Sequence, residues 1–193
     1  MIAKLILLPL LATLSLASPV HVQRDAQAGK RIRSLASPNL CVTVQNGYAA
    51  YGTRVALTAC SQGSNGDGYL DEFQYWSVTG PQRGQIKLSS KDYMCLDAGD
   101  ESNGAGITIE ACEDGKDSQI WTVGTTGTGS QPNLQLSVGS AESQCLDVVK
   151  DSTPVQSKPY GSEKDAQVWS CHTQDGNTAD AIQQFFELAT ADE

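Results

Sequence analysis

Residues 95–121 read CLDAGDESNGAGITIEACEDGKDSQIW, and this stretch carries a pattern that the chain repeats three times. A cysteine opens the pattern, a second cysteine follows, and glutamine, any residue and a large aromatic residue close it. The three closing units are Gln74-Tyr75-Trp76, Gln119-Ile120-Trp121 and Gln184-Phe185-Phe186. A repeat this short cannot bury its own apolar face, so the copies are expected to pack against one another.

The spacing of apolar residues within the repeats predicts β-strands. An apolar residue stands nine positions before the first cysteine of each repeat, and others stand five and three positions before the second cysteine. Such alternation is typical of half-buried strands, so each repeat offers about four short strands between glycine-, asparagine- and proline-rich turns. Residues 180–188 could also form a helical turn, but the alignment of Phe186 with Trp76 favours a strand.

The six cysteines of the chain predict three disulfides, because thiols of exported proteins tend to pair. Six cysteines allow 15 pairings, and the repeat singles out one of them. The expected bridges are Cys41–Cys60, Cys95–Cys112 and Cys145–Cys171. Each closes a loop of about 20 residues and would contribute roughly 3 kcal/mol by restricting the unfolded chain. A metal-thiolate site is a poor alternative, since no Cys-x-x-Cys spacing occurs.

The N-terminal residues predict a secreted, extracellular protein. Residues 1–17 have the features of a signal peptide, with Lys4 before an apolar stretch and Ser15-Leu16-Ala17 as a small-x-small cleavage site. Residues 18–31 are polar and end in Lys30-Arg31. This pair either marks the end of a short propeptide or belongs to an N-terminal arm that flanks the first strand.

The remaining residues, 32–190, have the length of a single domain. Its repeats are expected at about 32–80, 84–124 and 133–189. The formal net charge of the chain is −9, so its surface repels phosphate backbones and nucleic acid is not an expected partner. No stretch after the signal peptide approaches the length of about 18 apolar residues that a membrane-spanning helix needs.

The repeats resemble the ricin B-type lectin family, whose hallmarks are a Cys-Leu-Asp segment, a Val-x-Leu-x-x-Cys strand and a Gln-x-Trp unit. The matching segments are Cys95-Leu96-Asp97, Cys145-Leu146-Asp147, residues 55–60, residues 107–112 and the three closing units. The resemblance extends over residues 32–188. It implies an all-β fold, the β-trefoil of three pseudosymmetric four-strand repeats, and non-covalent carbohydrate binding without catalysis.

The third repeat contains a second glutamine-x-aromatic segment, Gln167-Val168-Trp169, but this segment directly precedes Cys171 and therefore lies on the strand before the second cysteine. In sugar-binding repeats of the family, that strand carries the glutamine and the aromatic ring that meet the ligand. The resemblance thus implies a carbohydrate site in the third repeat. Its expected members are Asp147, Gln167, Trp169, Gln183, where the family usually has Asn, and Gln184.

These residue types suit sugar recognition. A sugar presents C–H groups that can lie on the face of Trp169, and an ionised aspartate accepts hydrogen bonds from two hydroxyls. We expect Asp147 and Gln184 to hold adjacent hydroxyls, and Gln167 and Gln183 to orient the sugar ring, because an amide both donates and accepts. The alternative is structural, since such aspartates and glutamines often satisfy backbone groups where strands turn.

The other two repeats are weaker candidates. The second repeat keeps Asp97 and Gln119, which define a possible weaker site, but it has Thr108 and Glu110 where the glutamine and the ring should be. For Asp97 and Gln119 a structural role is favoured. The first repeat has Thr43 in place of the aspartate and predicts no site.

Other functions have less support in the sequence. The chain has two histidines, of which only His172 lies within the predicted domain, so a catalytic triad is not expected. No cofactor and no metal are expected either. The expected partners are glycans or polysaccharides. The alternative is a β-trefoil scaffold that has lost sugar binding and acts as an inhibitor or interaction module through inserted loops such as residues 151–165.

Overall fold

The computed structural model describes residues 29–61, 72–126, 133–154, 162–172 and 181–190. The predicted signal peptide and residues 18–28 lie outside the described residues. Within the described part of the chain, no helix has the length and apolar character needed to cross a membrane.

Each repeat contributes one barrel strand, one hairpin and one closing segment. The first repeat contains β1 (Arg31–Ser34), β2 (Leu40–Val44), η1 (Gln45–Gly47) and β3 (Thr53–Ala59). The second contains β4 (Gln82–Gln85), β5 (Lys87–Leu88), β6 (Lys91–Asp97), β7 (Thr108–Ala111), η2 (Asp117–Gln119) and β8 (Ile120–Thr126). The third contains β9 (Asn133–Val138), β10 (Gln144–Val148), β11 (Lys164–Ser170), η3 (Ala181–Gln184) and β12 (Phe186–Ala189).

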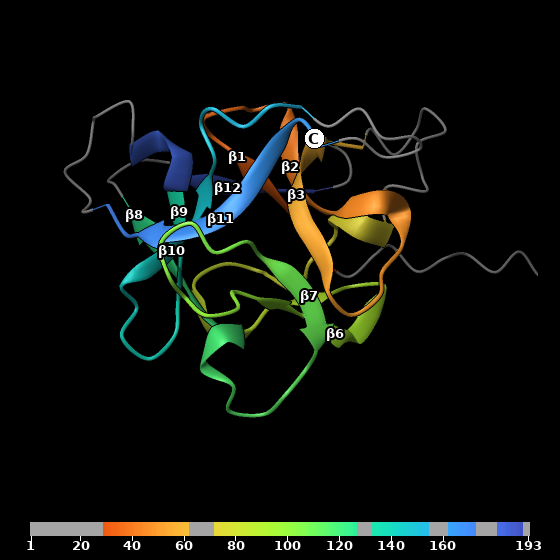
Figure 1. The fold of residues 1–193 in the computed structure, drawn as a ribbon, viewed down its shortest axis with the longest axis vertical. Coiled ribbons are helices and arrows are strands. Elements are labelled where there is room, and N and C mark those ends of the chain that lie inside the picture. Colours follow the sequence, from red (N-terminus) through yellow and green to blue (C-terminus); the bar gives the residue numbers. More distant parts are fainter. Residues whose placement is uncertain (1–28, 62–71, 127–132, 155–161, 173–180, 191–193) are drawn as a thin grey trace, which may run out of the picture.

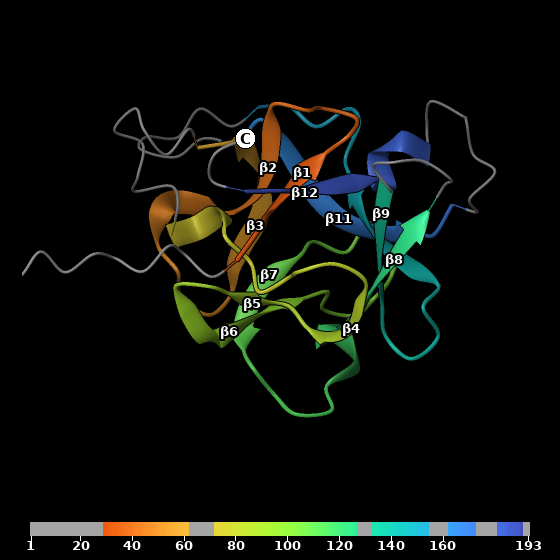
Figure 2. The same cartoon turned by 180° about the vertical axis from the view of Figure 1, so that it is seen from behind.

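The barrel strands form a ring of antiparallel pairs, β1 with β12, β12 with β9, β9 with β8 and β8 with β4 (Figure 2). Trp76 closes this ring, because it bridges Lys30 on one side and Leu88 on the other. The three hairpins cap the barrel, and Figure 1 shows β3, β7 and β11 converging on one face. There β3 pairs with both β7 and β11, and Gly106 bridges Gln167. The predicted β-trefoil is confirmed.

The core contains the residues that the repeat pattern predicted. The closing aromatics Trp76, Trp121 and Phe186 are fully buried. The apolar residues nine positions before the first cysteines and those on the strands before the second cysteines are also fully buried: Ile32, Ile86, Leu136, Val55, Leu57, Ile107, Ile109, Ala166 and Val168. In residues 180–188, η3 precedes β12, so the expected strand is confirmed at Phe186 and follows a short helical turn.

The three predicted disulfides are confirmed, and each lies within one repeat. They join Cys41 to Cys60, Cys95 to Cys112 and Cys145 to Cys171, with Cα–Cα distances of 4.9, 5.0 and 5.0 Å. Each bridge joins the first strand of a hairpin to the residue that directly follows the second strand, and so restrains the register of the strands that carry the candidate site residues.

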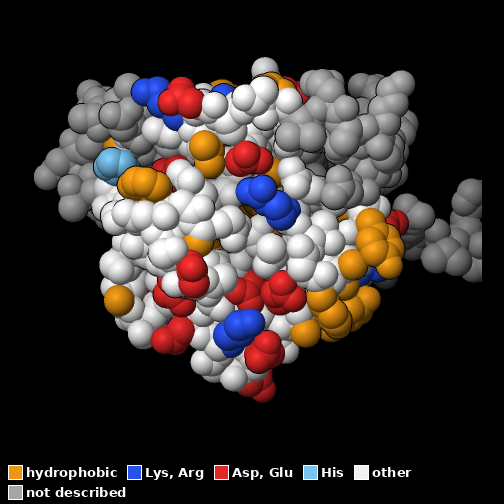
Figure 3. Space-filling model, viewed as in Figure 1, with side chains coloured by type: hydrophobic (Ala, Val, Ile, Leu, Met, Phe, Trp, Pro, Cys, Tyr) orange, Lys and Arg blue, Asp and Glu red, His pale blue; other side chains and the backbone are white. Residues whose placement is uncertain are grey.

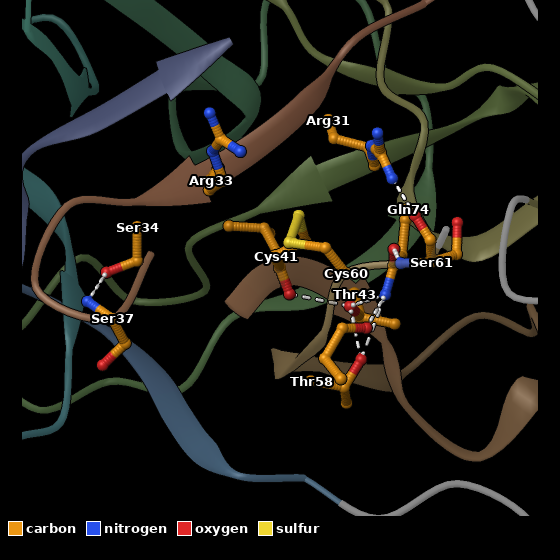
Figure 4. The surroundings of a disulfide bond; sticks show 12 residues. Arg31, Arg33, Ser34, Ser37, Cys41, Thr43, Thr58, Cys60, Ser61 and Gln74 are labelled. Atoms are coloured by element: carbon orange, nitrogen blue, oxygen red, sulfur yellow. Dashed lines mark hydrogen bonds between the residues drawn. A yellow bond between two sulfur atoms is a disulfide. The ribbon is translucent and has the colours of Figure 1, made fainter. Parts of the chain in front are cut away.

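A buried glutamine holds the backbone on both sides of the second cysteine in every repeat, an arrangement that we call the glutamine clamp. In the first repeat, Gln74 Oε1 accepts from Ser61 N at 2.8 Å, and Gln74 Nε2 donates to Ala59 O at 2.9 Å (Figure 4). Gln119 makes the same two bonds with Glu113 N and Ala111 O. Gln184 makes them with His172 N and Ser170 O.

A second long side chain supports each clamp from the position ten residues before the first cysteine. Gln85 Nε2 donates to Glu113 O at 2.9 Å, and Gln135 Nε2 donates to His172 O at 3.1 Å. Arg31 takes this place in the first repeat, where its guanidinium donates to Ser61 O and Thr190 O and lies over the ring of Tyr75. It therefore ties the first strand to the end of the last one.

The dibasic pair Lys30-Arg31 is part of this folded region. Lys30 exchanges two backbone hydrogen bonds with Trp76, at 2.9 and 3.0 Å, and the Arg31 side chain is buried. Cleavage after Arg31 would therefore remove both residues from the barrel.

We predict that Arg31→Ala lowers the free energy of unfolding by about 2 to 3 kcal/mol, because buried carbonyls lose a charged donor. Arg31→Gln should lose about half as much, since Gln85 and Gln135 already make the equivalent bond in the other repeats. Urea denaturation of the three proteins measures both differences. Equal losses in the two variants would contradict the proposed equivalence of Arg31 and the two glutamines.

Candidate functional site

The hairpin of β10 and β11 brings three of the expected site residues to one place. In the register of this pair, Asp147 lies opposite Gln167, and Trp169 follows two residues later on the same face as Gln167. Gln167 Nε2 donates to Asp147 Oδ1 at 2.9 Å. Gln184, at the end of η3, donates from Nε2 to Asp147 Oδ2 at 3.2 Å. The predicted residues Asp147, Gln167 and Gln184 are therefore in direct contact.

Trp169 faces outward, as its position between the inward-facing Val168 and the end of the strand predicts. Its side chain is 42% exposed, which is unusual for a tryptophan. Atom Cζ3 of the ring lies 3.8 Å from the position that a Cβ on Gly104 would occupy. The loop around Gly104 is fixed beside β11, because Asn103 Oδ1 accepts from Ser170 N at 2.8 Å. The ring is thus supported by a neighbouring repeat while much of it remains open to solvent.

The two adjacent glutamines of η3 differ in their surroundings. Gln184 is fully buried, and its amide is committed to the clamp and to Asp147, with Oε1 also accepting from Gln135 Nε2 at 3.2 Å. Gln183 is half-buried. The burial of Gln184 makes it a residue that positions Asp147, whereas Gln183 lies nearer to solvent.

Asp147 is a buried carboxylate that forms no ion pair within the described part of the chain. It is only 5% exposed, and among the described residues no lysine or arginine forms an ion pair with it. Burial raises the pKa of Asp147 above the ordinary value of 3.8, and hydrogen bonds from Gln167 and Gln184 and the charge of His172 offset only part of this rise. A carboxylate offers about four lone-pair sites, so Asp147 retains capacity to accept further hydrogen bonds.

The equivalent carboxylate of the second repeat is occupied by the protein itself. Asp97 Oδ2 accepts from Gln119 Nε2 at 3.0 Å and from Lys116 Nζ at 2.9 Å, and Oδ1 accepts from Gly99 N at 2.9 Å. Burial alone would raise the pKa of Asp97, but these hydrogen bonds, led by that of Lys116, hold the pKa below 3.8. On the adjacent strand Thr108 donates to Glu110, and neither offers a ring.

The first repeat has no carboxylate at this position. Gln74 Nε2 donates to the hydroxyls of Thr43 and Thr58, both at 3.1 Å, and these two hydroxyls lie 2.9 Å apart (Figure 4). The arrangement forms a closed polar cluster inside the hairpin.

Two features of the site were missed at the level of sequence. The first is Lys116, which stands three residues before Gln119 and pairs with Asp97. The equivalent position of the third repeat, three residues before Gln184, is Ala181, so the sequence shows that the third repeat has no lysine at this position. The second is the support of Trp169 by Asn103 and Gly104, which come from another repeat. The insertion at residues 151–165 is described only at its base, where Ser152 Oγ accepts from Asp165 N at 3.0 Å; residues 155–161 lie outside the described part.

A family model described as the ricin-type beta-trefoil lectin domain matches residues 28–136, which is more than half of the chain. The chain therefore belongs to this family. The match ends before Cys145, so the third repeat is assigned to the fold by its structure. A search of curated protein sequences gave no significant match.

Solved structures with the same fold include proteins of several kinds. The designed threefold-symmetric protein ThreeFoil has a TM-score of 0.57 and 19% identity, over 84% of this chain and 98% of that chain. The C-half of the earthworm R-type lectin, solved in complex with GalNAc, has a TM-score of 0.55 and 16% identity, over 83% and 97%. The cytolethal distending toxin from Actinobacillus actinomycetemcomitans has a TM-score of 0.56 and 13% identity, over 86% and 94%. At these identities the similarity shows the fold alone.

The two equivalent aspartates should respond to pH in opposite directions. The lowered pKa of Asp97 means that its contribution to stability is present above the unfolded-state pKa and is lost as the pH falls through the folded-state value. Asp147 has a raised pKa, so the folded protein binds its proton more tightly than the unfolded chain does. Its contribution to stability therefore grows as the pH falls through the folded-state value.

We predict that Asp97→Asn lowers the free energy of unfolding at neutral pH by about 1 to 2 kcal/mol, because charged hydrogen bonds are lost, and that this deficit shrinks on acidification. Asp147→Asn should cost less at neutral pH, and its deficit relative to the parent protein should grow on acidification. Urea denaturation at a series of pH values that extends from neutral to below 3.8 measures both trends. Parallel trends would contradict the assigned roles of the two carboxylates.

Proposed function

We propose that this protein is a secreted lectin that binds carbohydrate non-covalently, and without catalysis, through its third repeat. The observation that carries the proposal is the buried carboxylate of Asp147, which forms no ion pair with a lysine or arginine within the described residues and which shares a strand pair with the outward-facing ring of Trp169. Membership of the lectin family supports it. So does the GalNAc complex of the earthworm lectin, which has the same fold.

Each residue of the site has a distinct role in this proposal. Asp147 accepts hydrogen bonds from two sugar hydroxyls. These hydrogen bonds offset part of the free-energy cost of burying the carboxylate. Trp169 stacks against the C–H face of the sugar. Gln167 and Gln183 orient the ring through their amides, and Gln184 holds Asp147 in place from within the clamp.

A shallow site of this kind binds a single sugar weakly. We expect a dissociation constant around 1 mM for a monosaccharide, which corresponds to about 4 kcal/mol. Useful avidity then requires ligands that present many copies of the sugar, such as polysaccharides or clustered glycans. The weaker second site at Asp97 and Gln119 would have to displace Lys116 before it could bind, so it contributes little in this proposal.

A glycan array comparing the parent protein with Trp169→Ala and Asp147→Asn tests this function. Both variants should lose at least about tenfold in apparent affinity for every glycan bound, because a stacking surface or a charged acceptor is removed. Trp169→Phe retains an aromatic face and should lose less. Asp97→Asn is the matched control for Asp147→Asn and should bind as the parent does.

The array also distinguishes the lectin function from the alternative function, a scaffold that acts as an interaction module through its loops. If the parent protein binds no glycan, or if Trp169→Ala and Asp147→Asn bind as well as the parent, the third repeat is not a sugar site. The interaction module would then be the better description.

A further inference from the structure

Three tyrosines are prominently exposed on a surface that the third-repeat site does not use. Tyr48, Tyr51 and Tyr93 are 70, 57 and 53% exposed, more than any other large hydrophobic residue in the described part of the chain. Figure 3 shows hydrophobic side chains gathered over the turn that leads into β3 and over β6. We call Tyr48, Tyr51 and Tyr93 the tyrosine patch.

The sheet brings the patch together from two repeats. Gly52 N donates to Ile109 O at 2.9 Å, and Cys112 N donates to Tyr93 O at 3.0 Å, so Tyr51 and Tyr93 flank the end of β7 from its two sides. Because neighbouring strands lie about 4.8 Å apart, the backbones of these two tyrosines are about 10 Å apart. The phenol rings can therefore contact one ligand at the same time.

The turn that carries Tyr48 and Tyr51 is held in a fixed conformation. Thr53 Oγ1 donates to Tyr48 O at 3.1 Å, and Thr53 N donates to Ala50 O at 3.0 Å. Gly52 adopts a φ of +79°, which a side chain would disfavour. A fixed turn presents its rings without the entropy cost of ordering a loop on binding.

A polar acceptor lies beside the turn that carries Tyr51. Glu110 is on the outward-facing side of β7, between the two strands that lead to Tyr51 and Tyr93. Its Oε1 is 3.9 Å from the position that a Cβ on Gly52 would occupy. Aromatic faces next to a carboxylate combine the two contacts that a sugar uses, C–H stacking and hydroxyl donation.

We propose that the tyrosine patch is a second carbohydrate-binding surface, which takes a neutral glycan chain. An aromatic side chain buries 150–250 Å² when fully covered, so the three partly exposed rings offer roughly 400 Å². A stable protein interface needs about 800 Å² on each partner, so the patch is too small for one. A second copy of the chain would also be repelled by the net charge of −9. A sugar chain needs only ring faces and a few acceptors.

Depletion of the protein by insoluble cellulose, chitin and β-1,3-glucan tests this proposal. Three variants are compared with the parent: one with all three tyrosines changed to Ala, one with all three changed to Phe, and Ile182→Ala as an exposed hydrophobic control. On at least one of these polysaccharides, the triple alanine variant should bind at least about tenfold more weakly, since several stacking contacts are lost together. The triple phenylalanine variant keeps the ring faces and should bind nearly as the parent does.

The same assay in the Trp169→Ala background keeps the two sites distinguishable. Binding that survives Trp169→Ala but fails in the triple alanine variant supports the patch even if the third-repeat site is wrong. The proposal is overturned if the parent is not depleted by any of the three polysaccharides, or if the triple alanine variant is depleted equally. It is also overturned if the parent dimerises on gel filtration and the triple alanine variant does not, because the patch would then be a protein interface.

Discussion

The glutamine clamp is the constraint on which the rest of the structure depends. A fully buried glutamine in each repeat bonds to backbone groups on both sides of the second cysteine, where the strand leaves the hairpin and would otherwise bury unpaired polar groups. Its amide nitrogen has a further donor, which points to the residue two positions after the first cysteine. The clamp therefore demands an acceptor there, and the choice of acceptor differs among the repeats.

In the proposed function, that choice distinguishes the two structural repeats from the repeat that binds a sugar. Thr43 satisfies the clamp without a charge, and Asp97 satisfies it with a charge that Lys116 neutralises. Asp147 satisfies it with a charge that forms no ion pair with a lysine or arginine in the described residues. Hydrogen bonds from two amides offset part of the free-energy cost of burying this carboxylate. Its remaining lone pairs can accept hydrogen bonds from the hydroxyl groups of a ligand.

The fold was predictable because the same pattern of cysteines, apolar residues and closing aromatics occurs three times in the sequence. Strands, disulfides and core aromatics all follow from the spacing of cysteines and apolar residues, which the barrel enforces through burial. The contacts of long polar side chains were less predictable, because the spacing of residues in the sequence does not reveal where the polar end of each side chain lies. Arg31 belongs to a buried support although its sequence context resembles a processing site. Gln184 is fully buried and donates to Asp147, rather than being exposed beside it. Lys116 forms an ion pair with Asp97, and the repeat pattern does not predict this contact.

The central claim is that the ionised carboxylate of Asp147 is the acceptor for a sugar. Carboxyl ¹³C NMR of Asp147 and Asp97, titrated with acid in the presence and absence of a saturating oligosaccharide, tests it directly. Asp147 should titrate at higher pH than Asp97 in the free protein, and the ligand should lower the pKa of Asp147 alone, because hydroxyl donation favours the charged form. A bound oligosaccharide that leaves the titration of Asp147 unchanged would contradict the claim.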